Sequence, residues 1–150
     1  MNYLICDLLN NDEIKLILEG LSSNNKHWED GKKTAGSHAA ELKLNLQFDR
    51  NSEVSKKYTN LISKKITSNA LIKSFSLSKK THGLMFTKST KGMQYGRHID
   101  NAYMSSGRAD LSFTISLTDK STYDGGELII EEMNSEKEFK LNAGEIIIYP

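Results

Sequence analysis

The clearest strand pattern in the chain is Leu111-Ser112-Phe113-Thr114-Ile115-Ser116-Leu117. Apolar side chains alternate in it with hydroxyl side chains, and a β-strand places successive residues on opposite faces of its sheet. The stretch therefore predicts a strand with one apolar face, which belongs to a core, and one face of hydroxyl groups. The pattern alone leaves open whether the hydroxyl face lies inside the protein or in solvent.

Further short strands are expected on both sides of this stretch, because brief apolar runs are separated by turn signals. Tyr123-Asp124-Gly125-Gly126 and Asn142-Ala143-Gly144 are typical of turns. The additional strands that we expect in the C-terminal half cover residues 84–86, 95–99, 127–131, 139–141 and 146–149.

The N-terminal half carries helical periodicity. A first helix should follow a cap at Asn10 or Asn11, and a second helix should run from about Ser52 to Ser68. The buried stripe of the first helix is expected to hold Ile14, Ile17, Leu18 and Leu21. We also expect a short strand within residues 3–9 and a strand over residues 41–48. The second of these should bury its alternating apolar residues, which are Leu42, Leu44, Leu46 and Phe48.

Helices followed by many short strands indicate an α+β fold class with a sandwich or jelly-roll core. A chain of 150 residues is long enough for one core and too short to suggest two, so residues 1–150 are expected to form a single domain. The apolar strand at residues 146–149 is followed only by Pro150. We therefore expect more protein to follow, with the last strands of the fold beyond residue 150.

The composition excludes several classes of function. The 20 basic and 19 acidic residues give a net charge of +1, which provides no reason to expect a nucleic acid or an anionic membrane as partner. Cys6 is the single cysteine, so neither an intrachain disulfide nor a cysteine zinc site is available. No apolar run approaches the ~20 residues of a membrane-spanning helix. These features predict a soluble protein of the cytoplasm.

The motif His98-Ile99-Asp100 is the strongest chemical signal in the chain. On a strand, residues two apart point to the same face, so His98 and Asp100 would be able to share one metal ion. An imidazole and a carboxylate suit Fe(II), and a second histidine would complete a 2-His-1-carboxylate triad. The spacing alone is weak evidence, because four His and eight Asp residues in 150 positions give roughly 0.2 such pairs by chance.

Several other motifs raise the signal above chance, because they resemble one known family in the same order along the chain. The matching segments are Trp28–Gly36, Lys43–Gln47, Tyr95–Ala102, Arg108–Ser112, Tyr123–Leu128, Ala143–Glu145 and Tyr149-Pro150. Together they resemble the bacterial PKHD-type hydroxylases, which are Fe(II)- and 2-oxoglutarate-dependent oxygenases related to prolyl 4-hydroxylases. The family fold is a double-stranded β-helix, or jelly roll, with supporting helices at the N-terminus.

The resemblance implies that His98 and Asp100 are iron ligands and that 2-oxoglutarate is the co-substrate, with ascorbate as a further candidate cofactor. In the family, the distal histidine and the arginine that pairs with 2-oxoglutarate follow a Tyr-Pro that corresponds to Tyr149-Pro150. The remaining histidines of the chain lie outside that distal position, and they are His27, His38 and His82. The implied substrate is a prolyl or related residue of a protein or peptide, or a small molecule.

The resemblance also assigns the hydroxyl face to the interior of the protein. Candidate contacts of the co-substrate are Ser112, Thr114, Ser116 and Leu128. Arg97 and Arg108 are weaker candidates for binding an anionic group of the substrate. Trp28 and the Asp30-Gly31 pair that follows belong either to a loop that borders the pocket or to a structural anchor.

Two hypotheses from different classes follow from the sequence. The first is a 2-oxoglutarate-dependent dioxygenase that hydroxylates its substrate. The second is a jelly-roll binding module without catalysis, because the distal histidine and the 2-oxoglutarate arginine are absent from the 150 residues. A zinc hydrolase is a more distant alternative, since the usual zinc ligand sets are richer in His or Cys.

Overall fold

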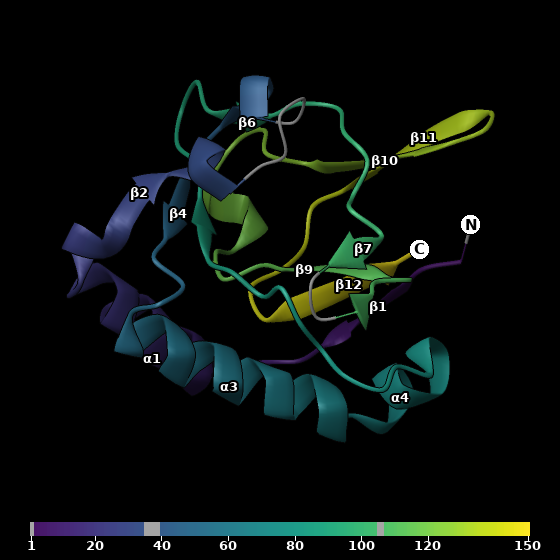
Figure 1. Ribbon diagram of the computed structural model, residues 1–150, viewed down its shortest axis with the longest axis horizontal. Helices are drawn as coiled ribbons and strands as arrows, with labels where there is room; N and C mark the ends of the chain where they lie inside the picture. Colours follow the sequence, from purple (N-terminus) through teal and green to yellow (C-terminus); the bar gives the residue numbers. More distant parts are fainter. Residues whose placement is uncertain (1, 35–39, 105–106) are drawn as a thin grey trace.

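The computed structural model describes residues 2–34, 40–104 and 107–150. Its main sheet has three antiparallel strands in the order β1-β12-β9, and two long helices lie against one face of that sheet (Figure 1). The strands are β1 (Leu4–Asp7), β9 (Ser112–Ile115) and β12 (Glu145–Tyr149). The helices are α1 (Asn11–Ser22) and α3 (Glu53–Ser68). The predicted α+β class is therefore confirmed.

Helix α1 begins where the sequence predicts, with a capping box at its first turn. The Asn10 side chain accepts a hydrogen bond from the Glu13 N–H, and the Glu13 carboxylate accepts one from the Asn10 N–H, both at 2.9 Å. Ile14, Ile17 and Leu21 are buried as expected. Leu18 is 38% exposed, so its place in the buried stripe was predicted wrongly. The stripe is narrower because only one side of α1 contacts the sheet and α3.

Helix α3 is capped by Ser52, whose hydroxyl accepts a hydrogen bond from the Ser55 N–H. Asn69 ends α3 and at the same time caps the separate short helix α4 (Ala70–Ser76), because its side chain accepts from the Ile72 N–H at 3.0 Å. The predicted second helix is thus confirmed at both ends.

The core has two parts, which lie on opposite faces of β12. Ile146 and Ile148 face the helices and pack in the larger cluster with Ile17 and Ile62. Ile147 faces the other way, into a smaller cluster with Ile130 and Leu141. The sequence of a strand that is buried on both faces is a continuous run of apolar residues, and residues 146–148 are three isoleucines.

Small antiparallel pairings complete the fold. β10 (Leu128–Glu132) and β11 (Ser135–Phe139) form a hairpin that projects at the upper right of Figure 1. A second sheet has the order β2-β4-β5, and two further pairs are β3-β6 and β7-β8. Their bounds are β2 (Trp28–Asp30), β3 (Lys43–Leu44), β4 (Leu46–Phe48), β5 (Thr87–Lys88), β6 (Gln94–Tyr95), β7 (Tyr103–Met104) and β8 (Gly107–Arg108). Single turns of 3-10 helix are η1 (Asn25–His27), η2 (Gly31–Thr34) and η3 (Lys120–Thr122).

The strand predicted over residues 41–48 differs from the structure in two ways. It is divided at Asn45 into β3 and β4, and its polar side chains are the buried ones: Lys43, Asn45 and Gln47. Leu42 and Leu44 are exposed instead. The expected burial of these two leucines was therefore wrong, although Phe48 is buried as predicted.

The polar side chains are buried because other segments lie against them. The Gly31 N–H donates to the Asn45 carbonyl at 2.9 Å, and a Cβ at Gly31 would come within 2.0 Å of the Asn45 side-chain oxygen. The Gln47 amide donates to the sulfur of Met85 at 2.7 Å. Alternation in sequence marks two faces, but it does not say which face the rest of the chain covers.

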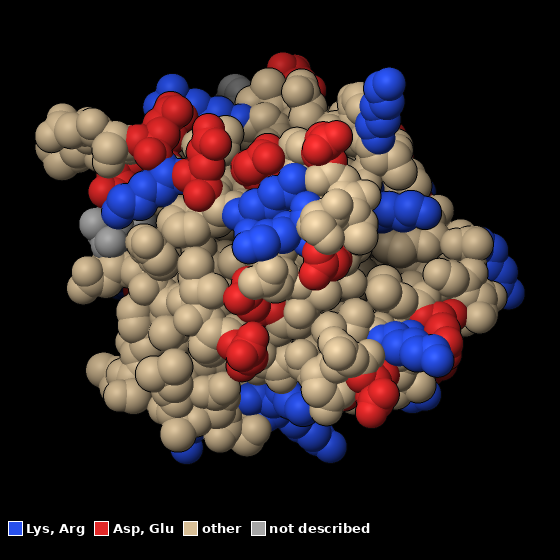
Figure 2. All heavy atoms as spheres, turned by 180° about the vertical axis from the view of Figure 1, so that it is seen from behind, with Lys and Arg blue, Asp and Glu red and all other residues tan. Residues whose placement is uncertain are grey.

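Three other strand predictions differ from the structure. Residues 84–86 form no strand, and β5 begins just after them at Thr87. Of the strand expected at 95–99 only Tyr95 lies in a strand, at the end of β6, and of the one expected at 139–141 only Phe139 does, at the end of β11. Among the described residues, no helix has the length and apolar character needed to cross a membrane. Acidic and basic side chains lie interspersed on the face seen in Figure 2.

Candidate metal site

His98 and Asp100 lie in the irregular loop between β6 and β7. The prediction that a strand carries them is therefore wrong, but their side chains still lie close together. The His98 Nε2 atom is 3.3 Å from the Asp100 Oδ1 atom, and the two side chains are 26% and 52% exposed. The loop thus presents one imidazole nitrogen and one carboxylate oxygen side by side, within reach of solvent.

The other nitrogen of His98 is held by backbone. His98 Nδ1 lies 2.8 Å from the Gly96 carbonyl oxygen. A carbonyl oxygen only accepts hydrogen bonds, so Nδ1 carries a proton, and the lone pair of a neutral ring would then lie on Nε2. This lone pair faces a carboxylate oxygen, and two such groups attract each other only when a proton or a cation lies between them.

The other oxygen of Asp100 is also held. Ser112 on β9 donates its hydroxyl to Asp100 Oδ2 at 2.5 Å. The sequence places Ser112 among the candidate contacts of the co-substrate, whereas in the structure its hydroxyl bonds to the carboxylate of the motif. Sequence periodicity identified the hydroxyl face, but it carried no signal for this long-range pairing.

Two tyrosines lie near Asp100. The Tyr95 ring stacks on the His98 ring, with centroids 3.8 Å apart and planes inclined by 16°. Burial, and then the negative charge of Asp100, raise the pKa of Tyr95. The same two causes raise the pKa of Tyr149, while a hydrogen bond with Thr114 lowers it. Both phenols therefore stay protonated at neutral pH.

The remaining candidates of the hydroxyl face lie in different settings. Thr114 is exposed and pairs in register with Ile147, on the sheet face that points away from the helices. Ser116 lies beyond the end of β9 and donates its hydroxyl to the Thr118 carbonyl at 2.7 Å. Leu128 packs against the smaller apolar cluster. Only Ser112 of the four candidates is shown in contact with the His98–Asp100 pair.

The two arginines already have carboxylate partners. Arg97 forms an ion pair with Glu131 of β10, and Arg108 Nε lies 2.5 Å from Asp110 Oδ1. Each guanidinium retains further N–H donors, so these ion pairs do not prevent either arginine from binding an anionic group of a substrate.

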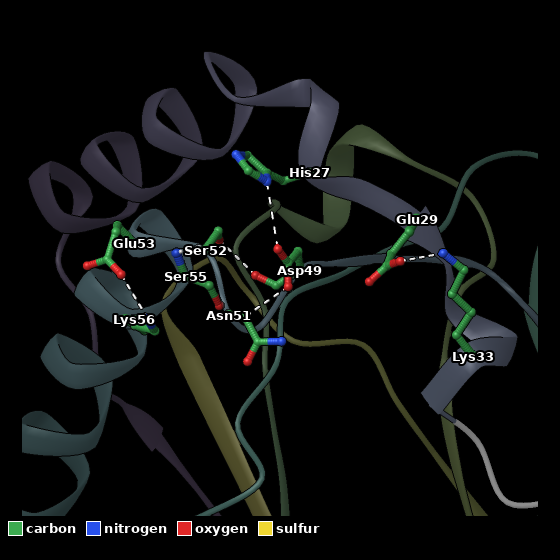
Figure 3. A network of polar contacts seen from close by, with 9 residues as sticks. All are labelled: His27, Glu29, Lys33, Asp49, Asn51, Ser52, Glu53, Ser55 and Lys56. Carbon is green, nitrogen blue, oxygen red and sulfur yellow. Dashed lines mark hydrogen bonds and ion pairs between the residues drawn. The ribbon is translucent and has the colours of Figure 1, made fainter.

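Trp28 is a structural anchor. Its ring packs edge-on against Phe48 at 5.1 Å, within the larger apolar cluster. Figure 3 shows the polar network next to it, which centres on Asp49. The Asp49 N–H donates to the His27 carbonyl, its side chain accepts from the Asn51 N–H, and its carbonyl accepts from the hydroxyl of the α3 cap. These contacts fix the start of α3 and do not involve the His98–Asp100 loop.

Of the other histidines, His27 is placed by its contacts away from the candidate site. His27 Nδ1 is 3.8 Å from Asp49 Oδ2 in that network (Figure 3). His38 lies outside the described residues, as do Ala35 and Gly36 at the end of the Trp28 motif. Among the residues that the structure describes, no three His, Cys, Asp or Glu side chains are close enough to hold a metal ion.

The donor pair fits two positions around a metal ion. Nitrogen and oxygen ligands bind at about 2.1 Å, so two ligands at right angles lie about 3.0 Å apart. The observed 3.3 Å is close to that value. The second atoms of both side chains are hydrogen-bonded elsewhere, so Nε2 and Oδ1 are the atoms that would face a metal ion.

Comparison with known proteins gives the class of this chain. A family model described as "2OG-Fe(II) oxygenase superfamily" matches residues 84–150, which include the His98–Asp100 loop and the strands β9 to β12. Curated proteins match over the full length of this chain. The PKHD-type hydroxylase of Prochlorococcus marinus strain MIT 9312 is 71% identical over 150 residues, which are 100% of this chain and 68% of that protein.

Two further relatives show the same coverage. The PKHD-type hydroxylase of strain MIT 9301 is 69% identical over 151 residues, and that of strain NATL2A is 51% identical over 150 residues. In both cases the match covers 100% of this chain and 68% of the relative. The chain therefore belongs to the PKHD-type hydroxylases of the 2OG-Fe(II) oxygenase superfamily. The family implies a hydroxylase-type function, with Fe(II) and 2-oxoglutarate as cofactor and co-substrate.

Proposed function

We propose that this protein is an Fe(II)- and 2-oxoglutarate-dependent dioxygenase in which His98 and Asp100 are two of the iron ligands. The observation that carries the proposal is the pair of facing donor atoms, His98 Nε2 and Asp100 Oδ1, at 3.3 Å. Family membership supports the cofactor and the reaction class. The fold proposed for the complete protein is the jelly roll of the family, with residues 1–150 in one domain.

The residues around the donor pair have separate tasks. When bound, Fe(II) together with 2-oxoglutarate supplies the oxidising chemistry of hydroxylation. His98 contributes a neutral nitrogen because Gly96 keeps its proton on Nδ1, and Asp100 contributes negative charge that offsets the charge of the metal. Ser112 holds the carboxylate so that Oδ1 faces His98.

The predicted contacts of 2-oxoglutarate remain Ser112, Thr114, Ser116 and Leu128. Ser112 and Thr114 are the better placed, because they lie on the sheet face that points away from the helices, and Ser112 touches Asp100. Ser116 and Leu128 make their described contacts elsewhere. The proposed substrate is a prolyl or related residue of a protein or peptide, or a small molecule. Ascorbate as a cofactor and a cytoplasmic location stay predictions.

The test measures metal binding and 2-oxoglutarate turnover in the same variants. We expect His98→Ala and Asp100→Ala to lose Fe(II) binding and succinate formation, because each removes one metal ligand. His27→Ala is the matched control, since His27 contacts Asp49 rather than Asp100. Unchanged succinate formation in His98→Ala would refute the assignment.

The second candidate function is a binding module of the same fold without catalysis. It is favoured by one observation, which is that the described residues bring no third metal-ligating side chain to His98 and Asp100. A protein that binds neither Fe(II) nor 2-oxoglutarate under anaerobic conditions would support this alternative against the dioxygenase.

A further inference from the structure

The ring of Tyr95 covers one face of the His98 imidazole. The two ring centroids are 3.8 Å apart, and the planes are nearly parallel at 16°. Offset stacking of aromatic rings is attractive beyond the apolar area that it buries. The contact therefore restricts the plane of the ring whose Nε2 atom faces Asp100.

Gly96, which lies between Tyr95 and His98 in the sequence, is fixed to a neighbouring segment. Its N–H donates to the Leu42 carbonyl at 2.8 Å, and its carbonyl accepts the hydrogen bond from His98 Nδ1. A Cβ at Gly96 would lie 3.1 Å from the Leu42 Cβ, which is a tight approach. The backbone that carries both rings is thus anchored on residue 42.

Tyr95 is itself held from the adjacent strand. Lys43 on β3 is its direct partner in the register of β3 and β6, and the Lys43 ammonium lies 4.9 Å from the centre of the Tyr95 ring. Lys43 is only 4% exposed, and this burial lowers its pKa. A cation near an aromatic face is attracted more strongly where water is excluded, so the Tyr95 ring has a fixed support.

The hydrogen bond and the stack constrain His98 in different directions. The bond from Nδ1 to the Gly96 carbonyl lies near the plane of the imidazole, and it leaves the ring free to tilt about the line that joins the two atoms. Contact with the parallel Tyr95 ring blocks that tilt. Both constraints are needed to keep the Nε2 lone pair directed at one point beside Asp100.

We propose that Tyr95 is a positioning residue, which fixes the plane of the His98 ring and thereby directs Nε2 toward the metal. This inference rests on the proposed metal site. Tyr95 acts through His98, so its removal should weaken metal binding without removing a ligand.

The first test measures the affinity of the protein for Co(II), which accepts the same nitrogen and oxygen ligands as Fe(II). We expect Tyr95→Leu to bind Co(II) about 10-fold more weakly than the wild type. Tyr95→Phe keeps the ring and should bind like the wild type. Tyr103→Leu is the matched control, because the Tyr103 side chain is exposed.

The second test uses proton NMR of the metal-free protein. A ring stacked on His98 shifts the carbon-bound protons of the imidazole upfield, so this shift should be present in the wild type and Tyr95→Phe and lost in Tyr95→Leu. Tyr95→Met repeats the comparison with a flexible side chain if the leucine variant does not fold, which circular dichroism will report.

The outcomes separate the two proposals. If His98→Ala binds Co(II) as well as the wild type, the metal site is refuted and the role of Tyr95 with it. If His98→Ala loses binding while the folded ring-less variants bind like the wild type, the metal site stands and the positioning role is refuted. Equal weakening in Tyr95→Phe and Tyr95→Leu also refutes it, because the ring would not be what matters.

Discussion

Ile17 and Ile99 are the same residue type in two opposite settings. Ile17 lies on α1, has no exposed surface and packs in the core with residues of α3 and the main sheet. Ile99, between His98 and Asp100 in the sequence, is 96% exposed. The helix–sheet region is thus ordered by burial of apolar surface. The loop is ordered by a few directed polar and aromatic contacts, since its central side chain contributes no burial. Stability and metal binding are therefore expected to depend on different residues.

The largest effect is expected from removing buried volume in the helix–sheet region. Ile17→Ala should lower the free energy of unfolding by about 3 kcal/mol, because it loses apolar burial and leaves a cavity. Ile99→Ala should change it by less than about 0.5 kcal/mol. Urea unfolding followed by circular dichroism measures both. A comparable loss in the two variants would show that the loop contributes to the core after all.

The next effect concerns Ser112, which joins the two regions because it lies on β9 and bonds to Asp100. Ser112→Ala should weaken Co(II) binding about 10-fold, since the carboxylate loses the contact that orients it. Ser112→Thr keeps the hydroxyl and serves as the control. Wild-type affinity in Ser112→Ala would mean that Asp100 needs no support from the sheet.

A smaller effect is expected from the ion pair that links the two helices. Lys65 Nζ on α3 lies 2.6 Å from Glu13 Oε1 on α1. The hydrogen bond from Lys65, and then that from the Asn10 N–H, lower the pKa of Glu13 below its ordinary value of 4.5. Glu13→Gln should cost about 1 kcal/mol at pH 7.

The pH dependence of that difference follows from its sign. Because the folded pKa of Glu13 is lowered, the unfolded chain binds more protons below 4.5, and the stabilisation is lost as the pH falls through the folded pKa. Wild type and Glu13→Gln should therefore converge in acid. Glu53→Gln removes a more exposed pair with Lys56 and should cost less than about 0.5 kcal/mol. A difference that persists in acid would contradict the ionic origin.

The smallest effect is expected where the loop meets the hairpin. Arg97 pairs with Glu131, but the Arg97 side chain is 82% exposed, so solvent screens the pair. Arg97→Gln should change the free energy of unfolding by less than about 0.5 kcal/mol. A loss above that range would show that the hairpin contributes to the order of the loop.

The two regions also differ in how far the sequence predicts them. Local spacing predicts a cap at Asn10 or Asn11, a second helix from about Ser52, the buried face of α1 at Ile17 and the apolar strand at the end of the chain. The structure confirms them, with Asn10 as the cap. Local spacing works there because one face of each element meets a continuous apolar layer.

Prediction is weaker where a face is covered by polar neighbours. Leu42 and Leu44 alternate as a buried strand should, yet Lys43 is the residue that is buried, because Tyr95 of the paired strand lies opposite it. The pairing of Ser112 with Asp100 is likewise a contact between separate segments. The spacing of residues within one segment does not show which distant segment covers it. The His98–Asp100 pair was therefore predicted from its motif, whereas the contacts that Ser112 and Tyr95 make with it were not.

The pairing of β1 with β12 has a consequence for the order of folding. Leu4 lies opposite Ile148, so the first strand of the main sheet meets its partner only after nearly the whole described chain has been synthesised. Contacts of such long sequence separation require a costly loop closure and form slowly. During translation, the edge of β1 has no partner strand until β12 leaves the ribosome. A nascent chain halted before residue 145 should therefore remain sensitive to protease, and protection should arise abruptly once β12 has emerged.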